Sequence, residues 1–218
     1  DRKGFIDFLT GRQPPFTSPV DQIGLIAHWE FNEGAGTLVA DSSSSGYDGA
    51  AVNIGWESSN CYEGACGRFS GVNGQVEIPS FNIVGNEITL AAWINPSSFG
   101  ISDARILSKA VGTAGDDHTF MLSTLNSGGT KLRFRLKTGG STQTHVCTDQ
   151  DLVVDEWQHV AAVYDGTGVT VYVNGIACTL DSGGIQSGMI TSADVPVWIG
   201  NNPSGGKTFD GFIDEVVI

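Results

Sequence analysis

Seven residues from Lys131 to Lys137 alternate between cations and apolar side chains. Successive side chains of a β-strand point to opposite faces, so Arg133 and Arg135 would share one face with the two lysines. Guanidinium groups bind carboxylate and sulfate through paired hydrogen bonds. The strand therefore predicts either a site for an anionic ligand, such as an acidic polysaccharide, or a solvated face whose cations pair weakly with nearby acids.

Two other sets of residues could contribute to a binding site. Asp117 and His118 follow Asp116 in a glycine-rich stretch, where they could bind a metal or the hydroxyl groups of a sugar. An ordinary solvated turn would have the same composition. Trp56 and Tyr62 are candidate platforms on which a sugar ring could stack, because each presents a large aromatic face.

The four cysteines fall into two groups. Cys61 and Cys66 flank a short loop, whereas Cys147 and Cys178 each lie in a β-like run. Four cysteines allow three pairings, and this grouping favours Cys61–Cys66 with Cys147–Cys178 over four free thiols. Disulfides imply an oxidising compartment, outside the cell or at its surface. A Cys61–Cys66 bridge would stiffen the loop that carries Tyr62, so we expect Cys61→Ser to weaken ligand binding more than stability.

Catalytic patterns are sparse in the sequence. A glycosidase needs two carboxylates on either side of the scissile bond, whereas Asp214 and Glu215 are adjacent and would point to opposite faces of a strand. Asp149 and Asp151 occupy alternate positions, as a glycosidase pair on one strand would, but they lie at the end of a strand. No nucleophile elbow, phosphate-binding loop or zinc-protease motif occurs. The sequence favours a binding protein over an enzyme.

Composition and charge narrow the class of protein. The 218 residues carry 24 acidic and 11 basic side chains, a net charge of −13. Such a chain repels polyanions overall, which argues against a nucleic-acid partner. No apolar run reaches the roughly 18 residues of a membrane span. Residues 1–23, with three prolines, indicate an arm or linker, and residues 24–218 indicate one domain.

Short strands separated by turns are predicted throughout the domain, without a helix. The Asn174-Gly175 pair between two β-branched runs is the strongest hairpin signal, because both positions of a type I′ turn need positive φ. Many short strands at regular spacing predict an all-β fold, a two-sheet antiparallel β-sandwich of the jelly-roll, concanavalin A-like type.

A two-residue turn at 139–140 would also set the register of the cationic strand. It pairs Arg133 with Val146 and Arg135 with Thr144. His145 would then lie on the face opposite the arginines. This register counts against a polysaccharide lyase, in which those groups share a face.

Several segments, in the same order, resemble laminin-G-like domains, which are concanavalin A-like and related to pentraxins. They include LIAHWEFNEGAG at 25–36, ADSS at 40–43, GYDG at 46–49, GRFSG at 67–71, ITLAAWI at 88–94, WQHVA at 157–161, YDG at 164–166, VYVNG at 171–175 and FDGFIDEV at 209–216. The resemblance implies a jelly roll used for glycan recognition, for protein adhesion or as an accessory module of polysaccharide-degrading enzymes.

The same resemblance implies a structural calcium ion near the first and last strands. By position, its ligands would include Asn32, Asp41 and Asp214, supplemented by backbone carbonyls. The structural alternative is that Asp41 hydrogen-bonds its own serine-rich turn and that Asp214 caps a strand end. The function predicted overall is a carbohydrate-binding module within a larger secreted or surface protein. The alternatives are a protein-adhesion or assembly module, as in a pilus, and a polysaccharide lyase or glycosidase.

Overall fold

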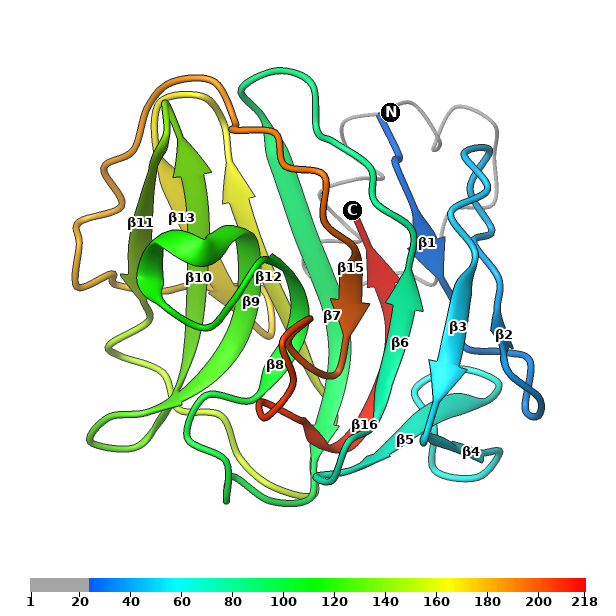
Figure 1. Cartoon of the computed structure of the whole chain (residues 1–218). Helices are drawn as coiled ribbons and strands as arrows, with labels where there is room; N and C mark the ends of the chain where they lie inside the picture. Colours follow the sequence, from blue (N-terminus) through cyan, green and yellow to red (C-terminus); the bar gives the residue numbers. More distant parts are fainter. Residues whose placement is uncertain (1–23) are drawn as a thin grey trace.

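Two stacked antiparallel β-sheets make up the protein, as the computed structural model shows (Figure 1). The structure describes residues 24–218, so the predicted arm over residues 1–23 lies outside the described part. The all-β sandwich predicted from the alternating runs is confirmed.

The first sheet, sheet A, has seven strands in line and an eighth, β1 (His28–Trp29), paired to β16. In spatial order the seven are β14 (Ile176–Ala177), β13 (Val169–Val173), β12 (Gln158–Tyr164), β7 (Ile88–Pro96), β16 (Asp210–Val217), β5 (Cys66–Ser70) and β4 (Gly55–Glu57).

The second sheet, sheet B, also has eight strands, and it carries the cationic segment. Their spatial order is β11 (Ser141–Val146), β10 (Thr130–Thr138), β9 (His118–Asn126), β8 (Arg105–Ala110), β15 (Val197–Ile199), β6 (Gln75–Ile78), β3 (Gly49–Val52) and β2 (Leu38–Val39). A single 3-10 turn in the described chain, η2 (Gly115–Asp117), comes just before β9.

The β10–β11 hairpin has the predicted register. Arg133 lies opposite Val146 and Arg135 opposite Thr144. His145 lies on the other face, where its ring is 6.3 Å from that of Phe134 and its two nitrogens contact neighbouring side chains. Strand alternation and turn length therefore placed this imidazole correctly, away from the arginines.

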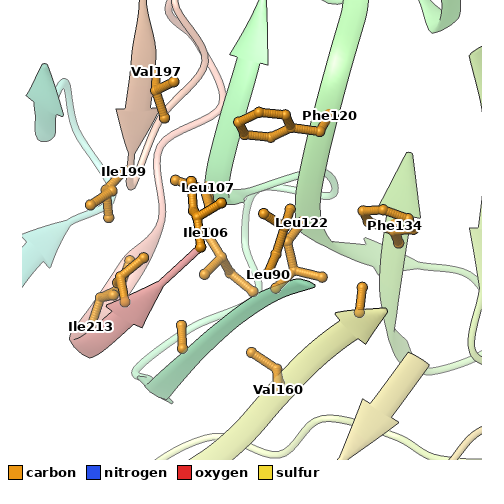
Figure 2. Packing of buried hydrophobic residues seen from close by; sticks show 14 of the residues in the cluster. Leu90, Ile106, Leu107, Phe120, Leu122, Phe134, Val160, Val197, Ile199 and Ile213 are labelled. Carbon is orange, nitrogen blue, oxygen red and sulfur yellow. The ribbon is translucent and has the colours of Figure 1, made fainter. Parts of the chain in front are cut away.

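The core lies between the two sheets. Leu132, Phe134 and Leu136, which alternate with the cations of β10, are fully buried. Figure 2 shows side chains from both sheets meeting in this layer, among them Leu90, Ile106, Leu107, Phe120, Leu122, Phe134, Val160, Val197, Ile199 and Ile213. Because the core occupies one face of each strand, the cations of β10 are left on the outer face of sheet B.

Both predicted disulfides form. Cys61 pairs with Cys66, and Cys147 pairs with Cys178, with Cα–Cα distances of 5.5 and 5.2 Å. No free cysteine remains in the described chain. The second bridge joins the end of β11 to the segment that follows β14.

We expect Gly200→Ala to destabilise the protein more than Gly205→Ala. Both glycines have a φ of +77°, but a Cβ at Gly200 would lie 2.1 Å from the buried Phe69 ring, whereas a Cβ at Gly205 meets nothing within 4 Å. The left-handed backbone alone costs alanine about 1–2 kcal/mol. Overpacking should add about 1–3 kcal/mol at Gly200.

Urea unfolding of both variants measures this difference. Equal losses in the free energy of unfolding would contradict the inference that contact with Phe69 requires glycine at position 200.

Candidate functional site

Three arginines meet on the outer face of sheet B. Arg105 on β8 lies opposite Ser123 on β9, and Ser123 lies opposite Arg133 on β10, so these three residues form one row across three strands. Arg135 lies two residues further along β10, on the same face. With Asp103 and Lys207, these arginines form what we call the basic cluster.

Asp103 is the carboxylate at the centre of the basic cluster. Its Oδ1 forms ion pairs with Nη1 of Arg105 and with Nη2 of Arg133, and its Oδ2 lies 3.6 Å from Nζ of Lys207. Arg105 is 0% exposed and Arg133 is 5% exposed, so these pairs are shielded from water. Arg133 is therefore shielded from water rather than solvated. The pairing with nearby acids that the second interpretation expects is present as well, because Lys131 pairs with the exposed Asp151.

His118 adds a neutral ring to the cluster. Its Nε2 accepts a hydrogen bond from Nη2 of Arg105, at 3.1 Å, and its Nδ1 lies 3.3 Å from the carbonyl oxygen of Gly115. Burial, together with the charge of Arg105, lowers the pKa of His118 to about 4. At neutral pH this ring is uncharged, so it contributes hydrogen bonds and no positive charge.

Arg135 makes the fewest hydrogen bonds and ion pairs of the three arginines within the described residues. Its Nε donates to Oγ1 of Thr144, at 3.0 Å, and neither of its Nη atoms has an acceptor among residues 24–218. Burial lowers the pKa of Arg135. Burial and the charge of Arg135 also lower the pKa of Arg105 to about 9 and that of Arg133 to about 10.

The basic cluster thus holds four cations and one carboxylate. This concentration of positive charge stands on a protein whose net charge is −13. Like charges this close repel each other, and partial burial weakens the screening by water. The arrangement can bind an anionic group with little rearrangement of its own side chains.

Three of the six predicted ligand-binding residues lie at this site: Arg133, Arg135 and His118. Asp117 lies nearby in η2, where its Oδ2 accepts the backbone N–H of Ala114 at 2.8 Å. The prediction missed Arg105, Asp103, Lys207 and Asn202, whose Oδ1 accepts from Nε of Arg105. The Asp103-x-Arg105 spacing was the available signal, because alternate residues at a strand share a face.

The other two predicted ligand-binding residues lie elsewhere. The Tyr62 ring stacks on Trp93 of sheet A, with 3.6 Å between centroids. Trp56 packs 6.2 Å from Phe31, and its Nε1 donates to the carbonyl of Gly36. These contacts place both rings away from the basic cluster, and their stacking role stays a prediction.

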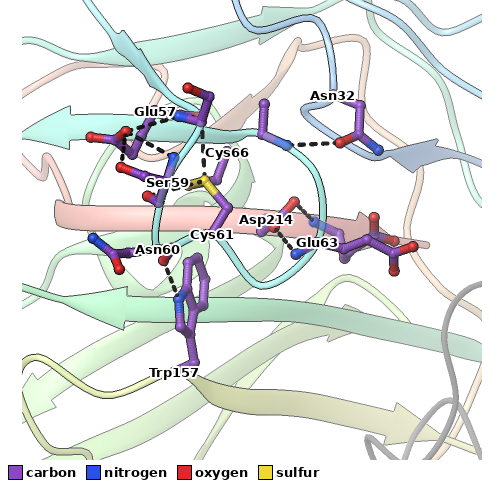
Figure 3. Close-up of a disulfide and its surroundings, with 12 residues drawn as sticks. Asn32, Glu57, Ser59, Asn60, Cys61, Glu63, Cys66, Trp157 and Asp214 are labelled. Carbon is purple, nitrogen blue, oxygen red and sulfur yellow. Dashed lines mark hydrogen bonds between the residues drawn. A yellow bond between two sulfur atoms is a disulfide. The ribbon is translucent and has the colours of Figure 1, made fainter.

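The loop closed by the Cys61–Cys66 bridge lies over strands of sheet A, near Trp157 and Asp214 (Figure 3). Tyr62 in this loop stacks on Trp93 of β7, which alternates with the core residues Ala92 and Ile94, so the loop lies on the side of the sandwich opposite the basic cluster. Trp157 donates from Nε1 to the carbonyl of Asn60, at 2.7 Å, and Asp214 accepts the backbone N–H of Glu63, at 3.1 Å. The expectation that Cys61→Ser weakens ligand binding therefore concerns a site on sheet A.

Asp41, a predicted calcium ligand, has both carboxylate oxygens occupied by donors. Oδ1 accepts the backbone N–H groups of His28 and Ser43, and Oδ2 accepts the N–H of Tyr47 and the hydroxyl of Ser43. Donor hydrogens that point at both oxygens are the opposite of what a cation requires.

The other two predicted ligands are occupied in the same way. Oδ1 of Asn32 accepts the N–H of Ala65, and the two carboxylate oxygens of Asp214 accept the backbone N–H groups of Glu63 and Glu215. The one group of three metal-type ligands within residues 24–218 contains the two cysteines of the Cys147–Cys178 bridge. The predicted residues therefore do not fit a calcium site in this arrangement, and calcium binding itself stays a prediction.

Comparison with known proteins identifies the family. The laminin G model described as the concanavalin A-like lectin/glucanases superfamily matches residues 70–218, well over half of the chain. The chain belongs to this superfamily. It is a laminin-G-like domain, as the ordered sequence segments predicted.

Among curated proteins, this laminin-G-like domain is 27% identical over 158 residues to adhesion G-protein coupled receptor V1 of Danio rerio. The match covers 71% of the chain and 2% of the receptor, so the domain spans a very small part of that protein. No helix in the described residues is long and apolar enough to cross a membrane.

Two solved structures illustrate the shared fold. Domain 4 of AbnA, an extracellular arabinanase from Geobacillus stearothermophilus in complex with arabinotriose, has a TM-score of 0.66 and 18% identity, covering 88% of this chain and 90% of that one. Trypanosoma rangeli sialidase in complex with sialic acid has a TM-score of 0.59 and 17% identity. The match covers 98% of this chain and 34% of the sialidase chain. At these identities the likeness shows the fold alone.

Proposed function

We propose that this laminin-G-like domain is a carbohydrate-binding module of a larger extracellular protein, and that its site is the basic cluster. The observation that carries the proposal is the Arg135 guanidinium group, which Thr144 orients beside Met121 on the outer face of sheet B and whose two Nη atoms have no acceptor within residues 24–218. Carbohydrate sites need a few positioned polar groups that are already held in place, because ordering them on binding costs affinity.

The extracellular setting has independent support. Two disulfides form within the domain, and such bridges persist in oxidising compartments. Two structural neighbours are seen with sugars bound, arabinotriose and sialic acid. The same fold serves many functions, so these neighbours support a sugar ligand without specifying it.

A protein-adhesion or assembly module is the second candidate. It is favoured by the match to an adhesion receptor. The two candidates differ in one measurable property, since only a carbohydrate-binding module would bind isolated glycans saturably.

A glycan array probed with the full chain tests the proposal. We expect saturable binding to at least one glycan class, weakened at least 10-fold by Arg135→Ala. Arg68→Ala is the matched control, because Arg68 is an exposed arginine on sheet A, 5.5 Å from the ring of Phe212. It should leave binding unchanged.

Absence of saturable binding to any glycan would overturn the proposal and favour the adhesion alternative. Binding that is lost in Arg68→Ala but kept in Arg135→Ala would show that the site lies on sheet A.

A further inference from the structure

We infer that the ligand of this site is an acidic glycan, and that Arg135 binds its carboxylate or sulfate group directly, beside Arg133. The inference rests on the proposed function and names the class of sugar.

The charge balance of the basic cluster favours an anionic ligand. Asp103 is shared among Arg105, Arg133 and Lys207, and no acidic side chain in the described chain pairs with Arg135. The repulsion between the cations of the basic cluster is strongest where water is excluded, and Arg105 and Arg133 are both buried. An anionic group beside Arg135 would offset this repulsion, which a neutral sugar cannot do.

The donors left unused identify the residue that binds it. Arg105 donates to Asp103, Asn202 and His118. Arg133 donates from Nε to Ser123, and its Nη2 pairs with Asp103. Among the residues that the structure describes, Arg135 has only its Nε engaged, by Oγ1 of Thr144, and its two Nη atoms are available. A planar pair of donors suits a carboxylate or sulfate.

Exposure gives the same assignment. Arg105 and Arg133 are buried, whereas Arg135 and Lys207 are half-buried. Lys207 lies 3.6 Å from the carboxylate of Asp103, whereas Arg135 has no acidic partner within residues 24–218. Arg135 is therefore the cation that an incoming anion would bind.

Calorimetric titration with matched polysaccharides tests the inference. The probes are a polyuronate and its carboxyl-reduced neutral form, and a sulfated glycan and its desulfated form. We expect at least one acidic member to bind at least 10-fold more tightly than its neutral partner, and this preference to weaken with added salt. The pair that shows the preference identifies the anionic group.

Variants of the full chain assign the preference to Arg135. Arg135→Gln should remove at least 10-fold of the affinity for the acidic member and leave that for the neutral member unchanged. Arg135→Lys should keep part of the affinity that Arg135→Gln loses, because lysine keeps the charge but not the paired donors. Arg68→Gln, on sheet A, should behave as wild type. If Arg135→Gln fails to fold, Arg135→Lys alone carries the test.

Three results would overturn the inference. Equal or tighter binding of the neutral members would refute the acidic class while leaving the proposed carbohydrate-binding function intact. An equal loss in Arg68→Gln and Arg135→Gln would indicate general charge attraction. Failure to bind any of the four polysaccharides, or any glycan on the array, would overturn both the inference and the proposed function.

Discussion

Asp103→Asn is expected to lower the free energy of unfolding by about 3 kcal/mol at low ionic strength. Asp103 is the carboxylate that pairs with the buried Arg105 and Arg133, and its own side chain is only 16% exposed. Removing one partner of a buried ion pair leaves an uncompensated charge, which costs about 3–5 kcal/mol. The residual exposure of Asp103 puts the expected loss at the lower end of that range.

Urea unfolding of the variant and of the wild type measures the loss. Asp151→Asn is the matched control, because Asp151 pairs with Lys131 at 3.0 Å but is 52% exposed. That variant should lose less than about 1 kcal/mol. Similar losses in the two variants would contradict the view that Asp103 holds a buried cluster of cations together.

Sulfate provides a second measurement on the same variant. If the basic cluster binds anions, sulfate should stabilise Asp103→Asn more than the wild type, because the variant has one more unbalanced cation. Sulfate also stabilises folded proteins in general, so only the difference between the two proteins counts. An identical gain in both would argue against anion binding at the cluster.

Removing the Cys147–Cys178 bridge is expected to cost about 3–4 kcal/mol of stability, in the double variant Cys147→Ala/Cys178→Ala. The bridge joins residues 31 positions apart, whereas Cys61–Cys66 joins residues 5 apart. In the chain-entropy account, a disulfide that closes a longer loop restricts the unfolded chain more. The same account gives about 2 kcal/mol for the shorter bridge.

Thermal and urea unfolding of the two double alanine variants compares the bridges. A larger loss from Cys61→Ala/Cys66→Ala would mean that the native contacts of its loop, such as Tyr62 on Trp93, outweigh chain entropy. Because Cys147 is fully buried, a variant with serine at this position would add the cost of an unsatisfied hydroxyl, and alanine avoids that complication.

The sequence by itself determined the features that depend on neighbouring residues. Alternation along β10 placed Arg133 and Arg135 on the outer face, and the two-residue turn at 139–140 set their partners on β11. Cysteine spacing indicated both disulfides, and the ordered laminin-G-like segments indicated the fold. Strand alternation and turn geometry act over a few residues, so the chain records them directly.

Only the tertiary structure decided which distant residues share a site. Arg105 joins Arg133 because β8, β9 and β10 are adjacent in sheet B, and Asp103 reaches both from the segment before β8. It also separated Tyr62 from the arginines, on the opposite sheet. The carboxylate of Asp41 accepts N–H groups from its own turn and also from His28 on β1, a contact between residues 13 positions apart. Long-range pairing of strands sets these contacts, and no local pattern of residues specifies it.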